Sequence, residues 1–228
     1  MRLLAIETAT MLGGIALIDD DTLIAESRMN VRVTHSERIM TEIDHVLKGA
    51  RLSLHDMDAF ALSIGPGSFT GLRVGLSTIK GLAYATGKGV VAVPTLEALA
   101  WNVPFTRHPV CPLLDARKKE VYTGLFKWTG HGFSRLMPEQ AMKLETLLAG
   151  IDEPAVFLGE GAMLYRNSIQ KTLGERALFA PPGAMVPSPA AVAHLGMITA
   201  RNGEYEDPVT LTPLYLRKSE AELKQKKP

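Results

Sequence analysis

The chain has 228 residues, of which 46% are hydrophobic and 21% are charged, a composition typical of a globular protein with a buried core. A formal net charge of +1 gives no overall field that would hold a polyanion, and the single cysteine, Cys111, excludes an internal disulfide and a zinc site built from thiolates. The apolar start is too short for a secretory signal, and no segment approaches the roughly 20 apolar residues that span a bilayer, so we expect a cytoplasmic protein without a membrane segment.

The first half of the chain alternates short apolar segments with turn residues. Its predicted strands are residues 3–6, 13–18, 22–27, 59–64 and 89–93. Its predicted helices are residues 34–49, residues 68–85 and a third that begins at Thr95. The first helix opens with a capping box, Thr34-His35-Ser36-Glu37, and ends at Gly49. The first three strands, separated only by turns, predict an antiparallel meander.

The second half repeats this order in shortened form. Its predicted elements are strands at 110–114, 120–128 and 156–159, helices at 144–148 and 190–200, and a strand-like piece at 214–216. The first strand of each half ends at an acidic residue, Glu7 in one and Asp115 in the other. We therefore expect two domains, residues 1–103 and a reduced second domain of residues 104–228, whose last helix and tail pack back on the first.

A glycine-rich segment, Gly65-Pro66-Gly67-Ser68-Phe69-Thr70-Gly71, joins a predicted strand to a predicted helix. Glycines at such a junction are typical of phosphate-binding loops. The spacing matches neither common loop, because Leu72 stands where a Walker loop needs lysine and Thr70 stands where a dinucleotide fingerprint needs glycine. The segment therefore gives little support to a nucleotide site.

Three glycines fall inside the helix that follows, where each costs roughly 0.5–1 kcal/mol relative to alanine. Gly71 and Gly75 are four residues apart and share one face, which Thr78 and Leu82 continue. Such a stripe of small residues allows another backbone to approach closely. The spacing alone favours neither of two neighbours, the chain's own sheet or a helix of a partner.

Motifs for independent catalysis are weak. Ile39 stands four residues after His35, where a metal-binding histidine pair would need its second member, and no Gly-x-Ser-x-Gly elbow occurs. Glu7 and Asp115 could hold Mg²⁺ over a cleft between the domains, or they could be turn residues. Ala9 stands where a glycine would admit a phosphate, which favours the second interpretation. A free-standing ATP-dependent kinase or hydrolase remains the alternative function.

Several motifs together resemble the bacterial TsaB (YeaZ) family, nearly from end to end. They are Leu4-Ala5-Ile6-Glu7-Thr8-Ala9-Thr10, His35-Ser36-Glu37-Arg38, the block from Gly65 to Gly75, Lys80-Gly81-Leu82-Ala83, Asp115-Ala116-Arg117 with Glu120-Val121-Tyr122, and Pro213-Leu214-Tyr215-Leu216-Arg217. The block from Gly65 to Gly75 is the most specific of these. Aspartate is usual in the family where this chain has Glu7, which weakens the case for an independent nucleotide site.

The resemblance implies an α/β protein of the actin-like ATPase (ASKHA) fold, made of two ribonuclease H-like domains with mixed sheets. It implies a non-catalytic partner in the synthesis of threonylcarbamoyladenosine (t6A) beside the anticodon of tRNA. The chemistry would belong to the paralogue TsaD, with which the chain would form a heterodimer. The ATPase TsaE would join them, and the isolated chain would form a homodimer. No cofactor or metal of its own is implied, and tRNA contact is expected only through the complex, although the basic tail after Arg217 leaves direct contact open.

The family's partner interface maps onto the first two predicted helices, at His35, Arg38, Ile39, Ile43, Phe69, Gly71, Leu72, Gly75, Thr78, Ile79 and Leu82. A vestigial nucleotide cleft maps onto Glu7, Thr8, Thr10, Asp115 and Arg117. Asp115 and Arg117 match the family pattern, but neither the residues nor the resemblance assigns them a role.

Overall fold

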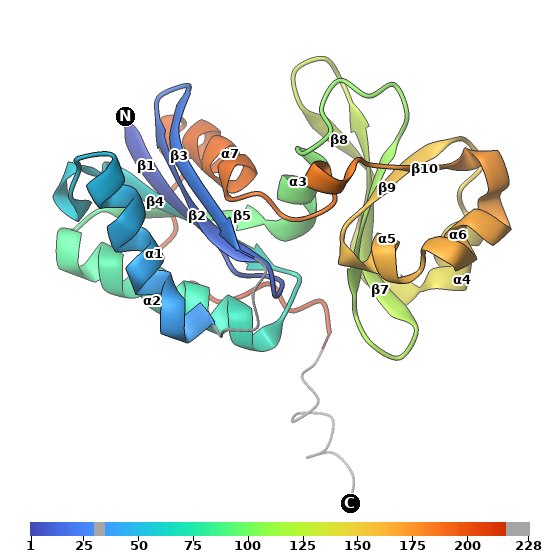
Figure 1. The fold of residues 1–228 in the computed structure, drawn as a ribbon, viewed down its shortest axis with the longest axis horizontal. Helices are drawn as coiled ribbons and strands as arrows, with labels where there is room; N and C mark the ends of the chain where they lie inside the picture. The colour runs from blue at the N-terminus through green and yellow to red at the C-terminus, as the bar shows by residue number, and fades with distance from the viewer. Residues whose placement is uncertain (30–34, 218–228) are drawn as a thin grey trace, which may run out of the picture.

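The computed structural model describes residues 1–29 and 35–217, which form two α/β halves (Figure 1). The predicted capping box begins at Thr34 and so lies partly outside the described residues, as does the basic tail beyond Arg217. Each half is built on a five-stranded mixed sheet. Within the described ranges, no helix is long and apolar enough to cross a membrane.

The first sheet has the strand order β3-β2-β1-β4-β5. Its strands are β1 (Arg2–Glu7), β2 (Gly13–Asp19), β3 (Thr22–Met29), β4 (Ala59–Gly65) and β5 (Gly89–Pro94). The predicted meander is confirmed, since β1, β2 and β3 pair antiparallel, whereas β4 and β5 run parallel to β1. Helices α1 (His35–Gly49) and α2 (Phe69–Thr86) cover one face of this sheet.

The second sheet repeats the first strand for strand, in the order β8-β7-β6-β9-β10. Its strands are β6 (Val110–Asp115), β7 (Glu120–Trp128), β8 (Phe133–Lys143), β9 (Ala155–Leu158) and β10 (Ala177–Phe179). Its helices are α4 (Leu144–Ala149), α5 (Glu160–Leu164) and α6 (Arg166–Leu173). The sequence missed β8, β10, α5 and α6, and the predicted strand at 214–216 is wrong, because that segment is not in a sheet.

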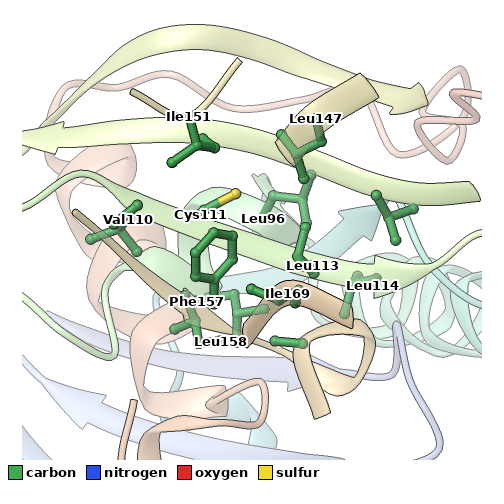
Figure 2. Close-up of a cluster of buried hydrophobic side chains, with 14 of the residues drawn as sticks. Leu96, Val110, Cys111, Leu113, Leu114, Leu147, Ile151, Phe157, Leu158 and Ile169 are labelled. Carbon is green, nitrogen blue, oxygen red and sulfur yellow. The ribbon is translucent and has the colours of Figure 1, made fainter. Parts of the chain in front are cut away.

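A continuous apolar core fills the space between the second sheet and its helices. Leu113 of β6, Phe157 of β9, Leu147 of α4 and Ile169 of α6 meet there, together with the single cysteine, Cys111 (Figure 2). Burial raises the pKa of the Cys111 thiol to about 12, so this cysteine is a core residue rather than a nucleophile. The short helix α3 (Thr95–Ala100) connects this core to the first half.

The chain returns to its first sheet after completing the second. Helix α7 (Pro189–Arg201) packs on the face of the first sheet opposite α1 and α2, against Leu3, Ala61 and Val91 (Figure 1). Ser188 caps α7 by accepting a hydrogen bond from the N–H of Ala191. The first half is therefore a three-layer sandwich whose third layer comes from the end of the chain.

Candidate functional site

The glycine-rich segment makes a tight turn that brings the ends of β1 and β4 together. A side chain on Gly67 would collide with the backbone carbonyl of Ala9, which accepts a hydrogen bond from the N–H of Ser68 at 2.7 Å. Ser68 then caps α2 by accepting from the N–H of Gly71. Gly65, the last residue of β4, has a φ of 119°. The glycines thus serve the turn, and Ala9 occupies the place next to Gly67.

The predicted role of Gly71 and Gly75 as a close-approach surface for a partner is wrong. Gly75 faces its own sheet, where an added Cβ would overlap Oγ1 of Thr8. Gly71 is also buried within the chain. The small residues let α2 lie close against the end of β1. Of the two neighbours that the spacing allowed, the chain's own sheet is therefore the one found, and not a helix of a partner.

Most of the predicted interface residues lie on the inner faces of α1 and α2 for the same reason. Their apolar side chains form the stripe that packs on the sheet, so they are not available to a partner. The buried members are Arg38, Ile39, Ile43, Gly71, Leu72, Gly75, Ile79 and Leu82. Phe69 and Thr78 are half-buried, and the side chain of His35 lies outside the described part of the structure.

Arg38 differs from its apolar neighbours because it is paired inside the chain. Its Nη1 lies 3.4 Å from Oε1 of Glu42, one turn along α1, and both side chains are 8% exposed. Burial raises the pKa of Glu42, and the Arg38 charge opposes that shift. Arg38 is therefore a buried, paired side chain and does not present a free cation.

The outer faces of the same two helices are open. Tyr84 on α2 is 93% exposed and Met40 on α1 is 54% exposed. Small exposed residues also lie at one-turn intervals along α2, at Ser77, Gly81 and Ala85. A Cβ on Gly81 would meet no atom from outside its own helix turn within 4 Å in the described part of the chain. We call these five exposed residues, Met40, Ser77, Gly81, Tyr84 and Ala85, the α1–α2 outer face. They lie on the solvent side of the two helices, whereas the buried stripe faces the sheet.

Glu7 does not reach the cleft that the sequence suggested for it. It is fully buried at the end of β1, where Oε1 accepts a hydrogen bond from the N–H of Ala9 at 2.6 Å. Burial raises the pKa of Glu7 to about 7, although the Ala9 N–H and the Ser63 hydroxyl oppose the shift. Thr8 and Thr10 are also buried, at 2% and 4% exposure. The predicted pair of strand-end carboxylates over a cleft is therefore wrong for Glu7.

Asp115 does line a cleft between the halves, with a volume of about 480 Å³. Arg117 and Thr10 line it too, and so do Glu160 and Arg217, which the sequence analysis did not assign to a cleft. Asp115 Oδ1 accepts from the N–H of Arg117 at 3.0 Å and from the hydroxyl of Tyr165 at 3.4 Å. Burial, and then the charge of Asp115, raise the pKa of Glu160. The cleft is thus walled by two carboxylates and two guanidinium groups.

Glu160 was missed because it follows Gly159 at the start of a helix too short to leave a periodic signal. Gly159 has a φ of 99° and its position allows close contact with the carbonyl of Leu113. This Gly-Glu pair after a short strand is the one signal that could have marked the position. Among the described residues, no three histidine, cysteine or acidic side chains are grouped as metal ligands would be.

Comparison with known proteins places this geometry in a family. Residues 30–225 match the family model described as "TsaD: tRNA N6-adenosine threonylcarbamoyltransferase". A protein of Bacillus subtilis (strain 168) named "tRNA threonylcarbamoyladenosine biosynthesis protein TsaB" is 34% identical over 98% of this chain and 97% of its own length. The chain belongs to the TsaB (YeaZ) family. The resemblance carried by the motif around Gly65 to Gly75 is confirmed over nearly the whole chain.

Solved structures show the fold of this TsaB family member. YeaZ from Pseudomonas aeruginosa superposes with a TM-score of 0.80 at 24% identity, over 94% of this chain and 99% of that one. Component A of (R)-2-hydroxyglutaryl-CoA dehydratase from Acidaminococcus fermentans superposes with a TM-score of 0.52 at 12% identity, over 88% and 99%. The two matching five-stranded sheets are those of the actin-like ATPase fold, as expected from the resemblance.

Proposed function

We propose that this chain is a non-catalytic partner in t6A synthesis, which binds a TsaD homologue through the α1–α2 outer face and activates it. The family membership supports the pathway, since curated relatives carry that name. The observation that carries the partner role is the exposure of Tyr84 next to the open Gly81 on α2, together with the exposure of Met40 on α1. Large apolar and aromatic side chains left open beside small residues are typical of protein interfaces.

The arrangement of α2 supports docking of a helix or loop rather than of a small molecule. Ser77, Gly81 and Ala85 form a shallow open track, and Tyr84 stands next to it as a ring that can be buried at little cost in side-chain entropy. The same face would serve self-association of the isolated chain. We propose that the homodimer and the heterodimer with TsaD are mutually exclusive for this reason.

We further propose that the chain supplies neither cofactor nor metal to the reaction, which TsaD and the ATPase TsaE would use in the assembled complex. The second candidate, an independent kinase or hydrolase, needs a pair of carboxylates at the strand ends. Glu7 is enclosed and Ala9 packs on Gly67, so only Asp115 of that pair lies in the cleft. ATP turnover by the chain alone, abolished in Asp115→Ala, would support this second candidate instead.

Reconstitution of the modification tests the proposal directly. TsaD, TsaE and substrate tRNA are combined with and without this chain, and t6A is measured in the digested tRNA. We expect formation of t6A only when the chain is present. Undiminished t6A without the chain would overturn the partner role.

Variants of the outer face test where the partner binds. Gly81→Arg adds a long side chain where there is open space, and Tyr84→Glu replaces the exposed ring, so neither should disturb the monomer. We expect each to weaken co-purification with TsaD by roughly tenfold or more, as loss of a central interface residue does. Matched controls are Gly183→Arg, another glycine with open space, and Leu164→Glu, another exposed apolar residue. Equal weakening by the controls would contradict the placement.

A further inference from the structure

A second hollow lies in the other half of the molecule, away from the α1–α2 outer face. It has a volume of about 660 Å³, within the range of ligand pockets, and is bounded by α4, α6 and the turn between β6 and β7. Helices α4 and α6 lie together on one side of the second sheet (Figure 1). None of the residues lining it belongs to the family motifs that the sequence analysis names, although Lys118 and Lys119 lie between two of them.

Three lysines surround this hollow, Lys118, Lys119 and Lys143. All three are exposed, and within the described residues none makes an ion pair. Glu145 is the one carboxylate among the lining residues, so the hollow carries a clear excess of positive charge. The whole chain has a net charge of only +1, so the positive charge is concentrated at this hollow and does not reflect a generally basic protein.

The backbone holds two of these lysines in an uncommon conformation. Arg117, Lys118 and Lys119 have φ values of 66°, 54° and 62°, which side-chain-bearing residues rarely adopt in succession. The turn is closed by the N–H of Glu120 donating to the carbonyl of Arg117 at 2.9 Å. It directs Arg117 to the cleft between the halves, while Lys118 and Lys119 line the hollow on the other side. Neither glycine nor asparagine, which this conformation favours, occupies the turn.

The rest of the lining suits a flat, partly apolar group. Leu144, Leu148 and Ala149 of α4 provide an apolar wall, and the half-buried ring of Tyr165 lies at the end next to the turn. The hydroxyls of Ser168 and Thr172, one turn apart on α6, line the opposite side. An aromatic ring and an apolar wall accept a base, hydroxyls accept a ribose or phosphate, and ammonium groups accept phosphate oxygens.

We propose that this hollow, the α4–α6 pocket, binds a nucleotide, with its phosphate against Lys118, Lys119 and Lys143 and its base against Tyr165 and the α4 wall. The nucleotide is either one unit of an RNA strand or a free mononucleotide. The proposal does not depend on the partner role of the α1–α2 outer face, because it uses the opposite half of the molecule and the isolated full-length chain.

Binding is tested by fluorescence anisotropy of a short labelled single-stranded RNA, with ATP and inorganic phosphate as competitors. The pocket variant is Lys118→Asn with Lys143→Gln, since asparagine tolerates the left-handed backbone at 118. The matched control is Lys88→Gln with Lys171→Gln, which removes the same charge from lysines that do not line the pocket. We expect the pocket variant to bind roughly tenfold more weakly or worse, and the control to bind like the wild type.

The competitors identify the source of the nucleotide. RNA binding that ATP does not displace indicates a strand, and displacement by ATP indicates a free nucleotide; both outcomes support the site. Displacement by inorganic phosphate as effective as that by ATP would overturn the assignment of a nucleotide. Absence of binding to RNA and ATP, or equal binding by the pocket and control variants, would overturn the site itself.

Substitutions at Tyr165 test the base contact separately from the charge. Tyr165→Phe keeps the ring and removes only the hydroxyl that donates to Asp115, whereas Tyr165→Ala removes the ring. We expect Tyr165→Phe to bind like the wild type and Tyr165→Ala to bind roughly tenfold more weakly. Equal affinity of the two variants would show that the ring does not contact the ligand.

Discussion

At the scale of single residues, Gly75 and Gly81 lie in one helix but have opposite surroundings. Gly75→Leu is expected to destabilise the fold by about 3 kcal/mol or more, because its side chain would overlap Thr8 at the end of β1. Gly81→Leu has open space and is expected to stabilise the helix by roughly 0.5–1 kcal/mol. Urea unfolding of both variants measures the difference. Equal stabilities would mean that α2 does not pack on β1 through Gly75.

The same pair shows what a helical pattern can and cannot predict. The spacing of Gly71, Gly75, Thr78 and Leu82 correctly places them on one face, because that follows from 3.6 residues per turn. Which part of the molecule packs against that face depends on the path of β1 and on Thr8, the residue after it, and both are distant from α2 in sequence. The buried stripe therefore could not be told from an interface stripe until the sheet was in place.

Glu7 leads to a prediction about pH. Its pKa is about 7 in the folded chain and near 4.5 when unfolded, so between these values the folded state holds a proton that the unfolded state has lost. The contribution of Glu7 to the free energy of unfolding is therefore complete below about pH 4.5. It falls by roughly 3 kcal/mol as the pH rises to about 7. Glu7→Gln, which keeps an oxygen for the Ala9 N–H, is expected to remove this fall.

Urea unfolding at pH 5 and pH 8 gives the change in the free energy of unfolding with pH for the wild type and for Glu7→Gln. The difference between these two changes isolates Glu7, because the pKa shifts of other groups are common to both proteins. Glu139, whose pKa burial also raises to about 7, provides a matched control. Glu139→Gln should remove its own contribution and leave that of Glu7. A Glu7→Gln variant with the full pH dependence of the wild type would refute the buried, proton-holding carboxyl.

At the scale of elements, the strands and helices with strong local patterns were predicted and the others were not. β8 was missed because it is an edge strand with many exposed residues and a proline, Pro138, so it has neither an apolar run nor a clean alternation. β10 and α5 have three and five residues, too few for any period. By contrast, α2 was placed within about one residue at each end, since Ser68 and Gly87 cap it.

Helix α7 leads to a prediction about fragments. Residues 1–103 alone would expose Leu3, Ala61 and Val91, which α7 covers in the whole chain. We expect this fragment to bind a hydrophobic dye and to lack a cooperative thermal transition. Addition of a peptide that spans α7, with Ser188 as its cap, should restore the transition. A fragment that unfolds cooperatively without the peptide would contradict a three-layer first half.

A matched control for that experiment uses Gly196, at which an added Cβ would overlap Ala61. A peptide with Gly196→Leu should fail to restore the transition, although its helix propensity is higher. Restoration by both peptides would show that helix formation, and not close packing on β4, is what the fragment lacks.

At the scale of the whole molecule, two copies of one sheet topology face each other across the cleft, and the last described segment connects them. The N–H of Leu214 donates to the carbonyl of Ile64 at 2.8 Å, and Tyr215 stacks on Phe69 with ring centres 4.7 Å apart. Two residues later, Arg217 donates to the carbonyl of Ala116 at 2.6 Å. The motif that ends at Arg217 thus holds the turn of one half against the glycine-rich turn of the other.

Arg217→Gln should therefore loosen the two halves without unfolding either. The variant loses the bond to Ala116 and the ion pair with Glu120, whose charged atoms lie 3.2 Å apart, and Arg217 is only 22% exposed. We expect a loss of about 1–2 kcal/mol in the contact between halves, seen as a larger radius of gyration in X-ray scattering and faster exchange of the Leu214 amide. Arg201→Gln, which breaks ion pairs with Asp20 and Asp21 inside the first half, is the control. An Arg217 variant that scatters and exchanges like this control would mean that Arg217 does not hold the two halves together.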